Sequence, residues 1–368
     1  MMRHLGGACL AAMALAACGP ADETAAASAP LQTASAENAA AASGARSESR
    51  KFRDWLAVCD NTNDCVAFGP ASEGTGWVRV GSAPGPNGAR TVSVGFWPSS
   101  GEGLTGPVTL TLDGRNHVAA PVAGDHEPVG VAQVRAADAA AVASGLAAGE
   151  TLTLAAGGET VTMSLSGASA AMLWIDERQG RLNTPAALVR KGTGAPSPVP
   201  GPESAPHVIA APPIAQTGFG DSGQTLPPAL EAVAAVKACR AETADTAVSN
   251  EVMSARLDAS TELWAVPCFA GAYNVGHDWY LTGPGGRNPR AVSLASAGGE
   301  TGAGTINGGY DAGTRTLSAF SKGRGIGDCG TASTWTWTGR SFVLSAESEM
   351  TECWGVPADF WPTTWRTR

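Results

Sequence analysis

Charge and long apolar runs are both scarce in this chain. Charged residues make up 15% of its 368 residues. Beyond the N-terminal segment no apolar run reaches the roughly 18 residues that a membrane-spanning helix needs. The most apolar stretch, 132–148, is interrupted by Arg135 and Asp138. The net charge of −9 and a pI near 5.1 indicate a surface without the basic excess that phosphate groups require. Nucleic acid is therefore excluded as a partner.

Several signatures of catalysis are also missing. The sequence contains no Walker motif and no His-x-x-x-His pair, and no two cysteines are separated by two residues. These patterns mark nucleotide hydrolases, zinc hydrolases and zinc or thioredoxin-like sites, respectively. We therefore predict no catalytic residue, no metal and no cofactor.

The first 17 residues have the pattern of an export signal. Leu5–Ala17 carries no formal charge and follows a weakly basic start. It is too short to span a membrane and is typical of a secretory signal. Leu15-Ala16-Ala17-Cys18 resembles the lipobox of bacterial lipoproteins, so we predict cleavage before Cys18 and a lipid on its sulfur. The alternative is an ordinary cleaved signal followed by a chance cysteine.

The residue after the lipobox indicates a location. Gly19 stands where an Asp would retain a lipoprotein at the inner membrane, so the resemblance implies the periplasmic side of the envelope, at the outer membrane rather than the inner one. Residues 18–49 are rich in Ala, Ser and Glu and are predicted to form a disordered tether. The membrane, reached through the lipid anchor, is the first expected partner.

Cysteine arithmetic predicts three disulfides. Of 8 cysteines, Cys9 leaves with the signal and Cys18 carries lipid, so an even set remains, which in an exported chain indicates disulfides. Two of them bracket a turn in the first domain, and two others flank a hairpin in the second. Three pairings are possible within the second domain. The favoured set is Cys59–Cys65, Cys239–Cys268 and Cys329–Cys353.

Composition predicts a mainly β fold with a few helices (α+β). Gly (47) and Pro (24) are abundant, which favours short strands and turns. Alternating apolar residues, as in 108–112 and 161–165, predict half-buried strands. Further strands are expected at 77–80, 91–96, 262–266, 279–281, 291–294, 316–320, 333–338 and 341–345. Helices are expected at 132–146, 169–180 and 228–239.

The same pattern predicts two strand-rich, disulfide-bearing domains. Residues 50–190 form the first, with order beginning near Phe52, and residues 225–368 form the second. Between them, 191–224 is rich in Pro, Gly, Ser and Ala, which is typical of an interdomain linker.

Two short motifs resemble functional sites only in part. Gly220-Asp221-Ser222-Gly223 copies the tetrapeptide around a trypsin-like nucleophile, but it lies in the linker without the rest of a triad. The acidic and amide loop 60–64 faintly resembles a calcium loop, yet Thr62 and Cys65 stand where that pattern needs Asp or Asn and then Gly. Plain turns are the preferred interpretation of both.

Two other segments carry the candidate binding residues. Trp335 and Trp337 would face one side of a strand, where they could stack on sugars or, as we favour, fill a core. In the loop 322–330, Lys322 and Arg324 could bind a carboxylate or phosphate beside three glycines. The alternative, which we favour, is a structural loop in which Asp328 forms a salt bridge with Arg324.

Several motifs together resemble known families. The opening Phe52-x-x-Trp55-x-x-x-Cys59 and the motif from Lys322 to Gly330 resemble a family of bacterial envelope proteins called DUF 1176, across about residues 50–368. The first domain also resembles the invasion-associated locus B family, whose members are small, disulfide-bearing, strand-rich periplasmic proteins. Neither resemblance implies an established catalytic activity.

The leading hypothesis is a non-enzymatic envelope lipoprotein that binds another protein or a cell-wall component. The alternatives are a cell-wall or glycan-processing hydrolase and a carbohydrate-binding module. Two carboxylates facing each other in a deep cleft would favour a hydrolase, and solvent-exposed Trp335 and Trp337 would favour sugar binding.

Overall fold

The computed structural model describes residues 46–98, 106–123, 130–195 and 199–368. The signal segment and Cys18 lie outside the described residues. Regular structure begins with strand β1 (Glu48–Phe52), whereas order was predicted to begin near Phe52. Among the described residues, no helix is long and apolar enough to cross a membrane.

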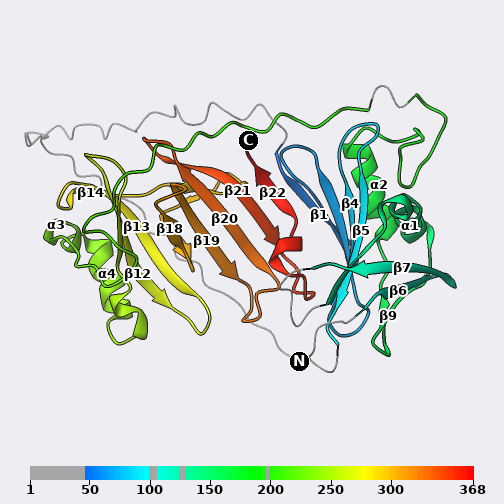
Figure 1. The fold of residues 1–368 in the computed structure, drawn as a ribbon, viewed down its shortest axis with the longest axis horizontal. Helices are drawn as coiled ribbons and strands as arrows, with labels where there is room; N and C mark the ends of the chain where they lie inside the picture. Colours follow the sequence, from blue (N-terminus) through cyan, green and yellow to red (C-terminus); the bar gives the residue numbers. More distant parts are fainter. Residues whose placement is uncertain (1–45, 99–105, 124–129, 196–198) are drawn as a thin grey trace, which may run out of the picture. The chain divides into compact units, whose positions relative to one another are not determined.

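Ten strands between residues 48 and 163 form one sheet, which we call sheet A (Figure 1). Its order is β1-β2-β3-β4-β5-β8-β7-β6-β9-β10, and its neighbouring strands are antiparallel. The alternation at 108–112 gives the predicted strand, because Val108, Leu110 and Leu112 are buried and the intervening threonines are less so. The remaining strands are β2 (Trp55–Cys59), β3 (Cys65–Pro70), β4 (Gly76–Ser82), β5 (Arg90–Phe96), β6 (Val108–Leu112), β7 (Arg115–Pro121), β8 (Gly130–Val134), β9 (Leu152–Ala156) and β10 (Glu159–Met163).

Two helices cover one face of sheet A, and one of them corrects a prediction. Residues 132–134 belong to strand β8, which pairs with β5 and β7, and only then does α1 (Ala136–Ala148) begin. Sheet pairing therefore overrides the helical propensity of that alanine-rich run. Helix α2 (Ala168–Arg178) is close to the predicted range, but its N-cap is Gly167 rather than Ser169.

The C-terminal residues form further antiparallel sheets. Sheet B has the order β11-β12-β13-β14, with β17 paired to β13, and sheet D has the order β18-β19-β20-β21-β22. The bounds are β11 (Met253–Arg256), β12 (Glu262–Ala270), β13 (Val275–Gly283), β14 (Arg287–Ala291), β17 (Gly304–Ile306), β18 (Gly309–Asp311), β19 (Thr316–Lys322), β20 (Gly330–Trp337), β21 (Phe342–Met350) and β22 (Thr363–Arg366), with a small ladder of β15 (Leu294–Ala295) and β16 (Thr301–Gly302).

The helix predicted at 228–239 is two helices. Helix α3 (Pro228–Glu231) ends before Val233, whose extended backbone is the N-cap of α4 (Ala234–Thr243). Helix α4 packs on sheet B through Val236 and Cys239, which join a buried cluster with Trp264 and Val266. Short 3-10 helices, η1 (Ala247–Asn250) and η2 (Ala358–Phe360), complete the helical segments of the described residues.

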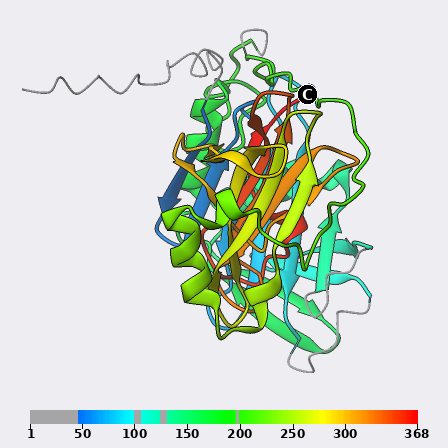
Figure 2. The same ribbon diagram turned by 90° about the vertical axis from the view of Figure 1, so that its left-hand side faces the viewer.

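Four buried clusters order these elements into layers. Helix α4 covers sheet B, and sheets B and D share a core that includes Trp279 and Trp335. The other face of sheet D, through Met350, packs with the outer face of sheet A, and α1 and α2 close the inner face. Figure 1 shows this succession from α4 to α1, and Figure 2 views it from the α4 side.

Strand β2 shows how the sequence serves two layers at once. All five of its residues are buried. Trp55, Ala57 and Cys59 belong to the core beneath the helices, whereas Leu56 and Val58 pack with the C-terminal residues. Because side chains alternate along a strand, an uninterrupted apolar run reports burial on both faces.

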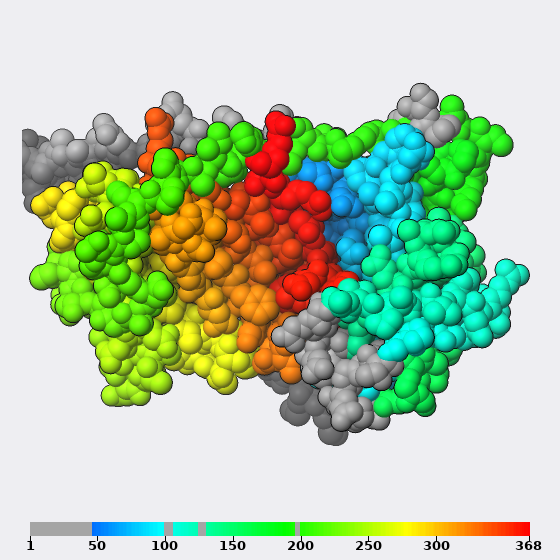
Figure 3. All heavy atoms as spheres, in the orientation of Figure 1, coloured from blue at the N-terminus to red at the C-terminus, as the bar shows by residue number. Residues whose placement is uncertain are grey.

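The Pro-rich segment contains no helix or strand in its described part, but it is hydrogen-bonded along its length. The Glu203 N–H donates to the Thr62 carbonyl at 3.0 Å, and the Ala211 N–H donates to the Trp337 carbonyl at 2.8 Å. Val208 and Arg368 are linked at 3.2 Å in the same way. Figure 3 shows this green segment on the surface beside the red C-terminal residues.

Candidate functional site

The loop between β19 and β20 holds its charged residues in place. Arg324 donates from Nε to Asp328 Oδ1 at 2.6 Å and from Nη2 to Asp328 Oδ2 at 2.5 Å. Asp328 is buried and also accepts the Gly355 N–H at 2.7 Å. The hydrogen bond from Arg324 to this carboxylate raises the pKa of Arg324. Arg324 is therefore committed to Asp328, as the structural interpretation of the loop predicts.

Glycine is required at both ends of this loop. Gly330 has φ +136°, and a Cβ there would lie 1.9 Å from the Ser321 carbonyl oxygen. A Cβ at Gly323 would lie 2.8 Å from Cys329 Sγ. The glycines thus let two strands and a disulfide approach closely. Gly325–Gly330 also has Gly-x-Gly-x-x-Gly spacing, but the loop joins two antiparallel strands and is not followed by a helix that could hold a pyrophosphate.

Beside this loop lies the tip of the β12–β13 hairpin. Asn274 donates from Nδ2 to the Lys322 carbonyl at 2.9 Å and accepts the Lys322 N–H at 3.3 Å. The hairpin and the loop expose three large apolar side chains, with relative exposures of 48% for Phe269 near the end of β12, 43% for Tyr273 in the hairpin turn and 53% for Ile326 in the loop. We call these three residues, together with Lys322, the tip surface. The sequence analysis did not single out its apolar members.

The two tryptophans are interior residues. Trp335 is 6% exposed and Trp337 is 1% exposed, and both belong to the core between sheets B and D. Trp335 donates from Nε1 to the Ala295 carbonyl at 2.6 Å. Neither indole face is available for stacking on a sugar, so the favoured interpretation of core packing holds and the stacking alternative is wrong.

The side-chain oxygens of the acidic loop at 60–64 bond to other groups of the protein. Asp60 Oδ1 accepts the Thr62 and Asp64 N–H groups at 2.8 and 3.0 Å, and Asp60 Oδ2 lies 2.5 Å from Arg366 Nε. Asn61 and Arg366 exchange two hydrogen bonds at 2.9 and 2.8 Å. The loop therefore tethers the last strand to sheet A.

A cleft of about 470 Å³ opens between β11 and β18. Phe219, Trp279 and Tyr310 line it, and Asp221 and Asp311 contribute the carboxylates. Backbone N–H groups of Thr314 and Gly313 lower the pKa of Asp311, whereas a general acid needs a raised value. Asp311 therefore does not have the raised pKa that the general acid of a glycan hydrolase needs.

The tetrapeptide at 220–223 is a turn beside this cleft. Ser222 is exposed, and the Gly220 carbonyl accepts the Ser254 N–H at 2.8 Å. No histidine lines the cleft. Of the described histidines, His277 is buried, with Nε2 3.2 Å from the Glu251 carbonyl, and burial lowers its pKa.

A buried polar cluster that the sequence did not reveal fixes α2 to sheet A. Arg181 donates to Ser82 Oγ and to the Gly85 carbonyl, both at 2.7 Å, and also to Gln179. Burial lowers the pKa of Arg181 to about 10, which leaves it charged at neutral pH. Asp176 accepts the Leu188 and Val189 N–H groups. These contacts are internal, so we assign the cluster a structural role.

The six cysteines form the three predicted pairs, Cys59–Cys65, Cys239–Cys268 and Cys329–Cys353. Asp278 lies near the Cys239–Cys268 pair, and Asp328 lies near the Cys329–Cys353 pair. A metal would need thiolates there, and these sulfurs are bonded to each other.

The fold and these sites define a strand-rich, disulfide-braced protein of mixed α+β structure. A family model described as "Protein of unknown function (DUF1176)" matches residues 49–368. The chain belongs to this family.

Two known proteins are similar to this chain. "Uncharacterized protein YpfG" of Escherichia coli (strain K12) is 28% identical over 342 residues, which is 87% of this chain and 93% of that protein. The crystal structure of invasion associated protein b from Bartonella henselae matches with a TM-score of 0.29 and 17% identity, covering 36% of this chain and 99% of that one.

Proposed function

We propose that this protein is a lipid-anchored, non-enzymatic binding or scaffold protein of the cell envelope. The observation that carries the proposal is the tip surface, where Phe269 and Tyr273 of the β12–β13 hairpin and Ile326 of the adjoining loop are all exposed. Exposed apolar side chains gathered in one place mark interaction sites, and aromatic residues are enriched where proteins bind each other. The disulfide Cys329–Cys353 and the Arg324–Asp328 pair hold one of these loops in shape.

We favour a protein partner over a cell-wall glycan. Sugars stack on aromatic faces, whereas Ile326, the most exposed of the three, offers only aliphatic surface. Lys322, at the end of β19, adds a cation beside the apolar group.

The location in this proposal rests on the N-terminal sequence. A signal at 1–17, a lipidated Cys18 and the tether predicted within 18–49 would hold the folded residues on the periplasmic side, and Gly19 favours the outer membrane. The two-domain division at 191–224 belongs to the same proposal. It is supported by two buried clusters, one within residues 52–189 and another within residues 211–365, and a third cluster joins the two halves where sheet D packs on sheet A.

Substitution of Cys18 tests the anchor. In Cys18→Ser the precursor should stay uncleaved by the lipoprotein peptidase, should incorporate no fatty-acid probe and should be lost from the outer-membrane fraction. Probe incorporation that persists in Cys18→Ser would refute lipidation at this residue.

A triple variant tests the tip surface. Phe269→Ser, Tyr273→Ser and Ile326→Ser combined should abolish capture of a partner that the wild type crosslinks in native envelopes. Ile209→Ser, at a side chain 68% exposed on the Pro-rich segment, is the matched control and should capture normally. Equal capture by the triple variant and wild type would refute the proposal. Binding to purified peptidoglycan that the triple variant loses would replace the protein partner with a glycan.

A further inference from the structure

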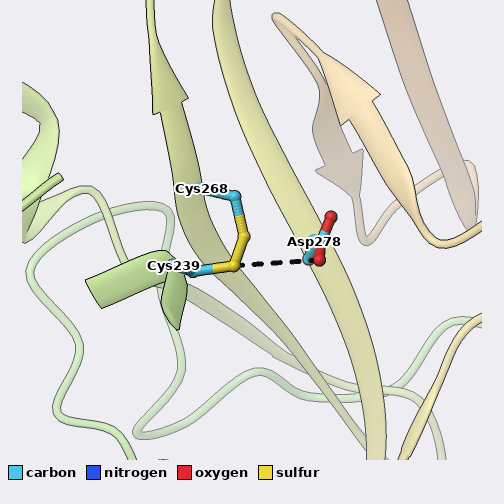
Figure 4. A group of neighbouring side chains, drawn as sticks. All are labelled: Cys239, Cys268 and Asp278. Carbon is cyan, nitrogen blue, oxygen red and sulfur yellow. Dashed lines mark hydrogen bonds between the residues drawn. A yellow bond between two sulfur atoms is a disulfide. The ribbon is translucent and has the colours of Figure 1, made fainter. Parts of the chain in front are cut away.

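Two cysteines and an aspartate from three elements meet at the α4 side of sheet B. Cys239 comes from α4, Cys268 from β12 and Asp278 from β13. The cysteines form a disulfide, and Asp278 Oδ2 lies 3.8 Å from Cys239 Sγ, as Figure 4 shows. A carboxyl group therefore faces a disulfide sulfur directly.

Asp278 has no structural partner that would explain its place. Among the described residues, no cation and no hydrogen-bond donor contacts its carboxylate, and burial raises its pKa. The charged groups of α4 lie elsewhere, since Arg240 donates to the Ser249 carbonyl and both Lys237 and Glu242 are exposed. On β13, Tyr280 shares the face of Asp278, and His277 lies on the opposite face. A partly buried carboxyl group without partners costs free energy, and such groups gather at functional sites.

Cys268 is placed where a reacting partner can approach it. The β12–β13 ladder shifts register between Pro267 and Phe269, so Cys268 is the unpaired residue of a bulge. Bulges redirect side chains and are common beside active sites. Cys268 is partly exposed, and its neighbour Phe269 is 48% exposed. A partner approaching from this side would reach the sulfur of Cys268 before that of the buried Cys239.

The other two disulfides lack this combination. Cys59 and Cys65 are both fully buried. Cys353 is exposed, but Asp328, the carboxylate beside that pair, is held by Arg324 and by the Gly355 N–H. The chain thus contains two reference disulfides. Cys59–Cys65 is inaccessible to solvent, and the carboxylate beside Cys329–Cys353 is already paired.

We propose that Cys239–Cys268 is an exchangeable disulfide that reacts with a dithiol, with Asp278 as the proton carrier of Cys239. A thiolate of the dithiol attacks Cys268 Sγ. A mixed disulfide forms, the Cys239–Cys268 bond breaks, and Cys239 leaves as a thiolate that takes a proton from Asp278. The second thiol of the dithiol then attacks the dithiol sulfur that is bonded to Cys268. This closes a disulfide within the dithiol and releases Cys268 as a thiolate. The dithiol is oxidised and the cysteine pair is reduced.

The reverse direction uses the carboxylate form of Asp278. When Cys268 is held in a mixed disulfide, Asp278 accepts the proton of the Cys239 thiol. The resulting thiolate attacks Cys268 Sγ, restores the bond and expels the partner thiolate. Only the thiolate is the nucleophile in such exchange, so a proton acceptor in contact with Cys239 accelerates closure. General acid–base assistance of this kind typically contributes factors of about 10²–10⁴.

The experiment follows all three disulfides in the full chain, purified in detergent, with dithiothreitol as the dithiol probe. Newly exposed thiols are trapped by alkylation at timed points and assigned by peptide mapping. In wild type, Cys239–Cys268 should open before the fully buried Cys59–Cys65. In Asp278→Asn its rate at the pH optimum of the wild type should fall at least about tenfold, with the other two pairs unchanged, and Asp278→Glu should recover most of the rate.

The pH profile separates proton transfer from a purely structural effect. The rate ratio of wild type to Asp278→Asn should change across the titration of Asp278 and should be constant if Asp278 only shapes the site. If Cys239–Cys268 opens no faster than Cys59–Cys65 in wild type, the disulfide is not exchangeable. If Asp278→Asn leaves its rate within twofold of wild type, Asp278 is not the proton carrier. Either result overturns the proposal.

Discussion

Removal of Arg324 should destabilise the protein by more than a surface salt bridge can account for. Asp328 is 4% exposed at its side chain and would keep only the Gly355 N–H after Arg324→Ala. Removing one partner of a buried ion pair costs about 3–5 kcal/mol, whereas a surface pair contributes about 0–1 kcal/mol. The Arg324 side chain is 43% exposed, so water can replace part of its interaction. We therefore expect a loss of about 2 kcal/mol, between these two cases.

Urea unfolding monitored by tryptophan fluorescence measures this loss. With a slope of about 3 kcal/mol per molar urea, the midpoint should fall by about 0.7 M. Lys322→Ala is the matched control, because Lys322 is a cation beside the same loop whose Nζ lies 6.0 Å from the centroid of the Phe320 ring. Its unfolding midpoint should stay near that of wild type. Adding Asp328→Asn to Arg324→Ala should recover part of the loss, because no buried charge is then left unpaired. Equal midpoints for Arg324→Ala and Lys322→Ala would refute the reasoning.

Three further predictions concern packing, backbone and pH. Met350→Ala empties a fully buried position between sheets A and D and should lower the free energy of unfolding by about 2–5 kcal/mol, as a urea titration would measure. Gly355→Ala places a Cβ 2.3 Å from Thr75 Cγ2 at φ +83° and should cost more than about 1 kcal/mol in the same assay; an unchanged midpoint would contradict the conformation assigned to Gly355. Burial raises the pKa of Tyr310 from 10.0 to about 12. The unfolded chain therefore loses this proton first, and stability should fall as pH rises from 10 to 12, a dependence that Tyr310→Phe should weaken.

Local sequence patterns predicted many of the strands and all three disulfides. Period-two alternation is a property of the strand itself, so the pattern at 108–112 predicted β6 without knowledge of the strands that pair with it. Cys59 and Cys65 bracket one turn, and Cys329 and Cys353 flank one hairpin, so short-range geometry was sufficient for these pairs. The Arg324–Asp328 pair could also be predicted from the sequence, because both residues belong to one short loop.

Errors arose where distant segments compete for the same residues. The alanine-rich run at 132–148 has helical propensity throughout, yet β5 and β7 recruit its first residues into sheet A. The apolar run of β2 signals burial on both faces, but its sequence does not say that C-terminal residues supply the second cover.

The candidate sites divide along the same line. Residue types and spacing predicted a strand-rich and disulfide-containing chain, because these features depend on composition and on neighbours within a few positions. Exposure and proximity depend on how separate elements pack. Packing placed Trp335 and Trp337 in a core, left Phe269, Tyr273 and Ile326 exposed together, and brought Asp278 of β13 within 3.8 Å of Cys239 on α4. No pattern within either segment encodes that last approach, since it follows from the docking of a helix on a sheet.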